Sequence, residues 1–190
     1  MFHINYQVRS SKNLRLEEDI FVESFADAVD SYQPDADLSV QIGETKIEME
    51  VDRDMYGFHE DILDITEALA FDLPSYGACK DIIEPRKPEQ KIYSIRFTEA
   101  YYPKIGYFIA DDKYVHLQTR TLQKDTVVML LDDAKDILCT RRDIILDVGT
   151  FLSNYVKDLI QEIPMVERLK DYKDYMERLQ KIQIQALAWE

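Results

Sequence analysis

Glycine and cysteine are scarce in this chain of 190 residues, which contains five of the first and two of the second. Loops that hold phosphates or present a nucleophile depend on glycine, and none of the motifs GxxxxGKS/T, GxGxxG and GxSxG occurs. This absence argues against NTPase, dinucleotide-binding and hydrolase-elbow chemistry. Cys79 and Cys139 are too few for a disulfide framework and lack CxxC spacing. We therefore expect a reducing, cytoplasmic location.

Long apolar runs and clusters of basic residues are also missing. No run approaches the roughly 18 apolar residues of a membrane span, and Met1–Asn5 lacks the basic and then apolar layout of a signal peptide. The 37 acidic residues outnumber the 23 basic ones, for a formal net charge of −14. Phosphate contacts need clustered Lys and Arg, so direct binding to nucleic acid is not expected, and neither is a membrane.

The negative charge is concentrated in the first half of the chain. Residues 1–89 contain 21 acids and 8 bases, whereas residues 90–190 contain 16 acids and 15 bases. Between Glu17 and Asp72, 18 acids are accompanied only by Lys46 and Arg53. Acids that served solubility alone would be spread over the whole surface. The asymmetry therefore indicates a local role.

Hydrophobic periodicity in the first half predicts a strand and two helices. Phe2–Val8 alternates apolar and polar residues as a half-buried strand does. Helical spacing of apolar residues extends from about Leu16 to Tyr32 and again from about His59 to Leu73, where Pro74 ends the helix. The residues expected on the buried stripe of the second helix are Phe58, Ile62, Ile65, Leu69 and Leu73.

A hairpin is predicted between these two helices, over Leu38–Val51. It turns on Gly43-Glu44, with glycine supplying the positive φ of a type II′ turn. This register makes one face wholly apolar. The facing pairs on it are Val40 with Ile47 and Leu38 with Met49.

The second half predicts short strands followed by two helices. The predicted strands are Lys91–Thr98, Ile105–Ala110, Tyr114–Thr119, Thr126–Leu131 and Asp136–Cys139. One helix is expected from a capping box at Thr140 to about Gln161, and the last from about Met165 to Ala188. Strands that come in hairpins favour an α+β fold, with an antiparallel sheet of about six to eight strands and about four helices. We expect a single domain over residues 1–190, with the loop 75–90 as the best position for an internal boundary.

The acids fall on the faces that the apolar pattern leaves exposed. Asp19, Glu23, Asp27 and Asp30 follow one side of the first helix, and the hairpin register sets Asp37 across from Glu50. Like charges close together on a helix or across a pair of strands destabilise the fold, and few basic residues in this window offset the repulsion. We interpret this as a docking surface for a basic partner, although a solvated face without a partner is the simpler alternative. The predicted partner-binding residues are Glu23, Asp27, Asp30, Glu48, Glu50, Glu60 and Asp64.

No catalytic residue, metal site or cofactor is predicted. The segment Asp52–Gly57 begins like a calcium loop, but Tyr56 and Leu63 stand where ligands are needed. His59 begins an HExxH-like run that lacks its second histidine, so we expect it on the surface or at a helix start. His3 and His116 are expected to be exposed residues of the sheet.

In overall character the sequence resembles the small acidic immunity proteins of bacterial polymorphic-toxin and contact-dependent inhibition systems. The features that carry the resemblance are the strand Phe2–Val8, the acidic hairpin Leu38–Val51 and the acidic helix entered by Phe58–Leu63. The resemblance implies a cytoplasmic, non-enzymatic protein that binds a cognate toxin, often a basic nuclease, and occludes its active site. It implies no particular site residue and leaves the oligomeric state open.

Three other functions are also compatible with the sequence. A DNA-mimicking inhibitor of a nucleic-acid enzyme, of the kind that phages encode, would share the same electrostatics. An enzyme with an acidic metal site could use paired aspartates at strand ends. The aspartates concerned are Asp111, Asp112, Asp132 and Asp133. A structural subunit would form a stable homo-oligomer and bind no basic ligand.

Overall fold

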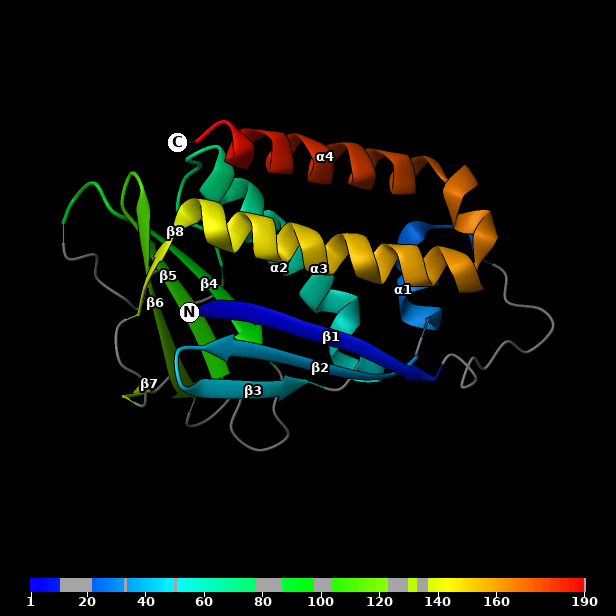
Figure 1. The fold of residues 1–190 in the computed structure, drawn as a ribbon, viewed down its shortest axis with the longest axis horizontal. Helices are drawn as coiled ribbons and strands as arrows, with labels where there is room; N and C mark the ends of the chain where they lie inside the picture. Colours follow the sequence, from blue (N-terminus) through cyan, green and yellow to red (C-terminus); the bar gives the residue numbers. More distant parts are fainter. Residues whose placement is uncertain are drawn as a thin grey trace.

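The computed structural model describes residues 1–10, 22–32, 34–49, 51–77, 87–97, 104–122, 130–132 and 137–189. Within these ranges the chain forms two antiparallel sheets and four α-helices, the last two of them C-terminal (Figure 1). The predicted α+β class is therefore confirmed. The sequence predicted a single sheet, whereas the structure has two, because a long helix separates the first three strands from the others.

The first sheet has the strand order β1-β2-β3, and β4, β5 and β6 form the body of the second. The strands of the first sheet are β1 (Phe2–Ser10), β2 (Asp35–Ile42) and β3 (Thr45–Met49). Those of the second are β4 (Lys91–Phe97), β5 (Lys104–Ala110), β6 (Tyr114–Leu122), β7 (Leu130–Asp132) and β8 (Ile137–Thr140). The short strands β7 and β8 pair with different parts of β6.

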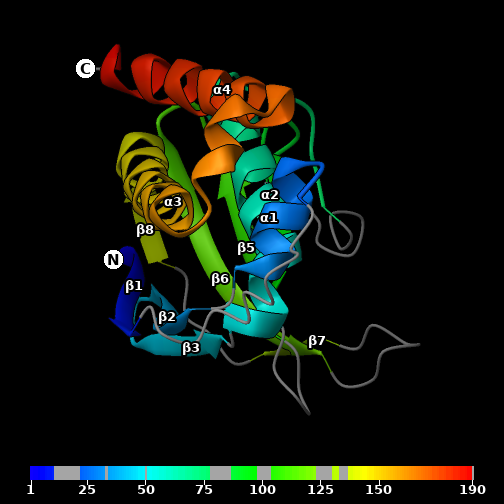
Figure 2. The same cartoon turned by 90° about the vertical axis from the view of Figure 1, so that its right-hand side faces the viewer.

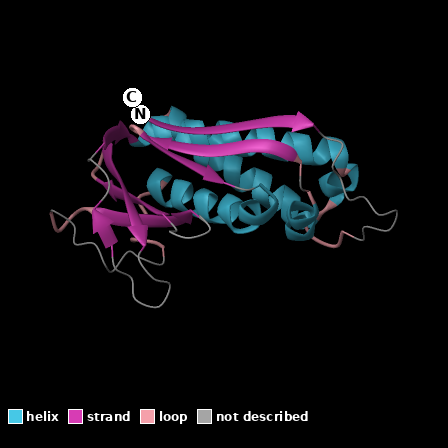
Figure 3. Cartoon of the chain, turned by 90° about the horizontal axis from the view of Figure 1, so that it is seen from below, coloured by secondary structure: helices cyan, strands magenta, loops and turns pink. Residues whose placement is uncertain are grey.

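The helices fill the space between and above the sheets (Figure 2). They are α1 (Phe25–Ser31), α2 (Val51–Ala70), α3 (Arg141–Glu162) and α4 (Lys170–Leu187), with a 3₁₀ turn at Pro164–Arg168. α3 is central, because it contacts β1, α2 and α4. Figure 3 shows the first sheet extending along the helices, whereas the second gathers at one end of them.

The hairpin is the part of the fold that the sequence predicted best. Leu38 lies opposite Met49 and Val40 opposite Ile47, as expected, and all four side chains are buried. Gly43 has a φ of 61° in the turn, which is the conformation that favours glycine. A Cβ at this position would also collide with the side chain of Ile137 on β8. The turn thus positions the first sheet against the second.

The predicted helix starts in the first half are wrong. α1 begins at Phe25 because Ser24 is an extended N-cap residue, and the residues before position 22 lie outside the described ranges. α2 begins at Val51, directly after the hairpin. The segment Asp52–Gly57, which was compared with a calcium-binding loop, is therefore helical. α2 ends at Ala70, and Leu73 beyond it is exposed rather than buried.

In the second half, Thr140 is confirmed as the N-cap residue of α3, and the predicted start of α4 is wrong. The Thr140 side chain accepts a hydrogen bond from the Asp143 backbone N–H at 3.0 Å. The last helix starts at Lys170 rather than Met165, because Pro164 opens a separate 3₁₀ turn and Leu169 is extended. Seven apolar residues at helical spacing along α3 are buried and form its core face. They are Ile144, Ile145, Val148, Phe151, Leu152, Tyr155 and Leu159.

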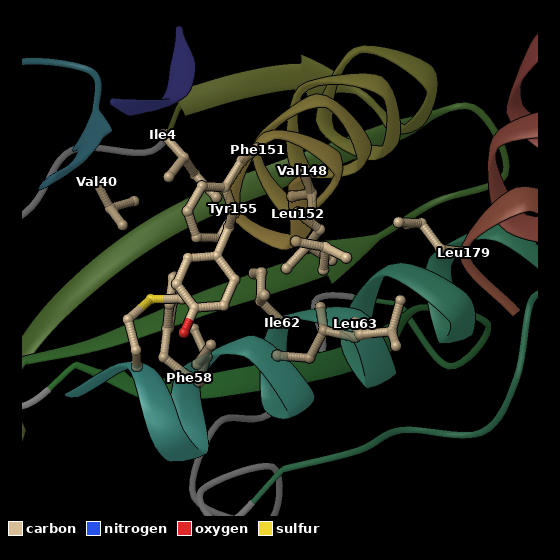
Figure 4. Close-up of a cluster of buried hydrophobic side chains, with 14 of the residues drawn as sticks. Ile4, Val40, Phe58, Ile62, Leu63, Val148, Phe151, Leu152, Tyr155 and Leu179 are labelled. Carbon is tan, nitrogen blue, oxygen red and sulfur yellow. The ribbon is translucent and has the colours of Figure 1, made fainter. Parts of the chain in front are cut away.

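The core lies where α3 packs on the first sheet and on α2 (Figure 4). Phe151 and Tyr155 of α3 meet Tyr6 of β1 edge to face, with ring centroids 5.9 and 5.7 Å apart. Phe58 of α2 packs on Phe151 from the other side, at 5.9 Å. One helix therefore joins the first sheet, α2 and α4 into a continuous apolar core.

The histidine predictions are partly wrong. His59 is 1% exposed in the middle of α2, because Phe25 of α1 and Tyr175 of α4 cover it. His3 is exposed as predicted, and its Nδ1 lies 2.7 Å from a carboxylate oxygen of Asp147 on α3. His116 is half-buried rather than exposed.

Candidate functional site

The short helix α1 is fixed in place by its N-terminal hydrogen bonds. Ser24 Oγ accepts from the Asp27 N–H at 3.1 Å, and Asp27 Oδ2 accepts from the N–H groups of Ser24 and Glu23 at 2.9 and 3.2 Å. The Phe25 N–H donates to Asp171 Oδ2 of α4 at 2.6 Å. The carboxylate of Asp27, predicted to contact a partner, is therefore also a structural cap of α1.

Three helices meet around Phe25, and exposed acids lie close to this contact along each chain segment. The Phe25 ring packs on His59 of α2 and on Tyr175 of α4, with centroids 6.0 and 4.7 Å away. Glu60 and Asp61 follow His59 on α2 and are exposed. We call the exposed acids within two residues of Phe25 or His59 along the chain, together with Asp171, the acidic junction. Its members are Glu23, Asp27, Glu60, Asp61 and Asp171.

Asp171 was missed by sequence reasoning, since it lies in the half of the chain whose charge is balanced. Nothing in its local pattern distinguishes it from the other acids of α4. Only the packing of α4 on α1 places it beside Phe25.

Asp64, in contrast, is taken up by contacts within the chain. Arg178 of α4 forms salt bridges to both Asp64 and Glu67, and its Nε donates to Glu67 Oε2 at 2.8 Å. The Tyr76 hydroxyl also donates to Asp64 Oδ2, at 2.9 Å. The two carboxylates raise the pKa of Arg178 against the opposing effect of its partial burial. Asp64 therefore acts as a link between α2 and α4.

Other bases from outside the acidic window neutralise more of its charge. Arg9 lies 3.0 Å from Asp35 and 3.4 Å from Asp37, across the first sheet. Asp72 lies 2.6 Å from Lys91 and 3.2 Å from Arg141. Counting charges along the sequence misses these pairs, since the bases precede or follow the window. The acidic junction keeps its excess because no ion pair to its members occurs among the described residues.

The carboxylate of Asp61 lies near two other carboxylates of α2. Its pKa is raised by partial burial first and then by the neighbouring carboxylates of Asp64 and Glu60, while His59 opposes the shift. The ionised form of Asp61 is thus disfavoured by burial first and by like charge second, and a nearby cation would lower its pKa again.

The hairpin acids do not join this surface. Glu48 alternates with Ile47 and Met49 along β3, and those two side chains face the core. Glu48 therefore points from the opposite side of the first sheet, where Lys46 lies 2.9 Å from it. Asp30 is exposed on α1, and Glu50 lies outside the described residues. The acidic stripes that the sequence suggested form at least two separate surfaces.

The alternative of a metal site gains no support from the described residues. Within them, no group of three or more His, Cys, Asp or Glu side chains could hold a metal ion. Asp111 follows β5 and accepts a hydrogen bond from Gln90 at 3.0 Å, and the exposed Asp112 follows it. Asp132 ends β7, and Asp133 lies outside the described ranges.

Comparisons with protein-family models, curated proteins and solved structures find no match for this chain. Within the described ranges, no helix combines the length and apolar character needed to cross a membrane.

The repulsion at Asp61 has a measurable consequence for stability. The pKa of Asp61 is higher in the folded chain than in the unfolded one, so its ionisation disfavours folding at neutral pH. Asp61→Asn should raise the free energy of unfolding at pH 7 by a few tenths of a kcal/mol. The gain should disappear as pH falls below the unfolded pKa of about 4, where the carboxyl is protonated in both states. Urea unfolding at pH 7 and pH 3 measures both values, and equal stabilisation at the two pH values would contradict the electrostatic cause.

Proposed function

We propose that this protein is a non-enzymatic binding protein that captures a basic protein partner through its acidic junction. The proposed role is that of an immunity protein. Its carboxylates would engage the Lys and Arg side chains that a nuclease-like toxin uses for its own substrate, and so occlude the toxin's active site. A toxin that binds nucleic acid must present such cations, which is why an acidic inhibitor suits it.

The observation that carries the proposal is the group of exposed carboxylates in the acidic junction, to which no described residue forms an ion pair. Burial and two neighbouring carboxylates raise the pKa of Asp61, and no ion pair from a described residue compensates it. A cationic side chain of a partner would lower this pKa and gain favourable energy in doing so. Surface charge of one sign also speeds association and disfavours partners of like charge.

The acidic residues of the junction are also carried by helices that pack closely on one another. Phe25, His59 and Tyr175 pack together beneath the junction, and the Asp171 carboxylate connects α4 to the start of α1. Carboxylates held on packed helices lose little freedom when a partner binds, which favours affinity. Glu48 of the hairpin forms a second candidate contact, on the side of the first sheet away from the core. Glu50, predicted with it, lies outside the described residues.

The test begins with capture of the partner on the immobilised protein, elution by salt and identification by mass. We then expect Glu60→Lys combined with Asp61→Lys to slow association by at least about tenfold at low salt, because rim charges act mainly on the association rate. A matched control, Glu44→Lys combined with Asp112→Lys, reverses the charge of two exposed acids that lie away from the junction. It should leave the association rate within about threefold of that of the original protein. Surface plasmon resonance over a range of salt concentrations measures all three proteins.

Two outcomes would contradict the proposal. Equal slowing in the two double variants would mean that net charge matters and the junction does not. A captured partner whose activity is unchanged by saturating protein would remove the role of inhibitor. A toxin gene directly upstream would support immunity, whereas capture of a host nucleic-acid enzyme would point to the DNA-mimic alternative.

A further inference from the structure

The two edges of the first sheet differ in how they are covered. At the β1 edge, α3 lies alongside, and Asp147 Oδ2 accepts a hydrogen bond from the backbone N–H of Ile4 at 2.8 Å. At the β3 edge, no other strand among the described residues pairs with Thr45–Met49. β3 forms the outer border of the sheet in Figure 1. A strand edge without a pairing partner among the described residues can present its backbone groups to another strand.

The hairpin turn determines which backbone groups of β3 point outward. In a two-residue hairpin the pair that flanks the turn, here Ile42 and Thr45, exchanges both backbone hydrogen bonds, and pairs then alternate. Thr45, Ile47 and Met49 therefore bond to β2. Lys46 and Glu48 direct their N–H and C=O groups away from the sheet.

Two observed hydrogen bonds agree with this alternation of inward-bonding and outward-bonding residues, which we call the hydrogen-bond phase of the sheet. The Gly43 N–H donates to Met1 O at 2.8 Å, as it must if odd-numbered residues of β2 face β1. Ile4 directs its N–H away from β2 to Asp147, as the same alternation requires on β1. The phase of the sheet is therefore consistent from one edge to the other.

The side chains of the two outward-bonding residues carry opposite charges. Lys46 and Glu48 lie on the outer face of the sheet, with side chains 54% and 79% exposed. Between them, Ile47 is fully buried on the inner face. The strand thus has a basic residue, Lys46, and an acidic residue, Glu48, on either side of Ile47. When two copies of the strand run antiparallel, this pattern is complementary to itself.

We propose that β3 pairs with β3 of a second copy of this chain, antiparallel and about a twofold axis at Ile47. In this register Lys46 of each copy lies opposite Glu48 of the other, and each such pair exchanges both backbone hydrogen bonds. Opposite charges directly across strands are stabilising. Moving the axis to Lys46 or to Glu48 keeps the hydrogen-bond phase but sets like charges opposite each other. The charge pattern therefore selects one register.

This pairing goes beyond the proposed function, and it forms a weak, salt-sensitive dimer. The interface is a short strand edge, and each copy carries a formal charge of −14. Long-range repulsion between the copies is screened by salt more strongly than the close cross-strand pairs are. Association should therefore strengthen when salt rises from about 20 mM to about 150 mM.

The test is sedimentation velocity of the isolated protein, from about 10 μM to about 1 mM, the range in which small interfaces associate. Lys46→Glu and Glu48→Lys should each weaken the dimer by at least about tenfold, because each replaces two attractive pairs with repulsive ones. The combined swap of both residues restores opposite charges and should return the dissociation constant to within about threefold of the original. Asp112→Lys, which changes the net charge as Glu48→Lys does, serves as the control.

Net charge and register make opposite predictions for Glu48→Lys. A less negative chain repels its copy less, so a charge-only model predicts stronger association, whereas the register predicts loss. Amide hydrogen exchange gives a second measurement, because the N–H groups of Lys46 and Glu48 should become protected as concentration rises. A protein that stays monomeric at 1 mM at both salt concentrations would overturn the proposal. So would a combined swap that fails to restore association while its unfolding transition is unchanged.

Discussion

Replacing Tyr155 with alanine is expected to lower the free energy of unfolding by about 3–5 kcal/mol. The side chain is fully buried on α3, and its ring lies 5.7 Å from Tyr6 of β1 and 5.6 Å from Tyr32, the residue that ends α1. Removing the ring would open a cavity where the first sheet, α1 and α3 meet. Because α3 is held by contacts with several elements, little collapse of the cavity is expected. Urea unfolding followed by circular dichroism measures the loss.

Tyr155→Phe is the matched control for that experiment. The Tyr155 hydroxyl is buried, and no hydrogen-bond partner for it occurs among the described residues. Burial raises its pKa, so the hydroxyl stays neutral across the accessible pH range. The phenylalanine variant should therefore be at least as stable as the original chain. A cost above about 2 kcal/mol would show that the hydroxyl has a partner, since that is the typical cost of leaving a buried polar group unpaired.

Asp72→Ala is expected to cost about 3 kcal/mol, although Asp72 itself is largely exposed. Its carboxylate accepts two hydrogen bonds at 3.2 Å from Arg141, whose side chain is only 4% exposed at the start of α3. Removing the carboxylate leaves that guanidinium with the Leu69 carbonyl at 3.3 Å and the Trp189 ring at 5.9 Å. Asp72 also has a φ of 54°, a conformation that costs alanine about 1 kcal/mol.

Asp72→Asn and Asp72→Gly separate the two contributions. Asparagine tolerates the positive φ and keeps an acceptor, so it should lose only the charge, whereas glycine should lose the acceptor without backbone strain. The hydrogen bond from Lys91 and the bonds from Arg141 lower the pKa of Asp72 against the effect of its partial burial. The stabilisation is therefore complete above the unfolded pKa and is lost as pH falls through the lowered folded pKa. Thermal unfolding at several pH values should show asparagine and aspartate converge in acid, and a constant difference would contradict the ion pair.

The elements that sequence reasoning predicted well depend on contacts close in the chain. The hairpin register follows from a two-residue turn and the alternation on either side of it, so Gly43 and the pair Val40 and Ile47 suffice to define it. The core face of α3 follows from helical spacing over a long segment with a cap at Thr140. Both signals are local, because turn geometry and side-chain periodicity need no knowledge of the rest of the fold.

The residues at which helices start, and the burial and ion pairing of individual polar side chains, were harder to predict from the sequence. Apolar residues at helical spacing precede Ser24, yet its N-cap hydrogen bonds start α1 at Phe25. His59 looked like a surface residue, because the aromatic rings that bury it belong to α1 and α4. Similarly, Asp64 looked free to bind a partner until Arg178, more than a hundred residues later, was found beside it.

The sequence by itself determined the α+β class, the pairing of the first hairpin and the concentration of acids in the first half of the chain. Only the tertiary structure decided which of those acids still carry uncompensated charge. The physical reason is that a charge interacts with whatever lies within a few ångströms, and folding brings Arg9, Lys91, Arg141 and Arg178 to the acidic window from either side of it. The same packing leaves Glu60 and Asp61 exposed at a junction of three helices, where the proposed interface lies.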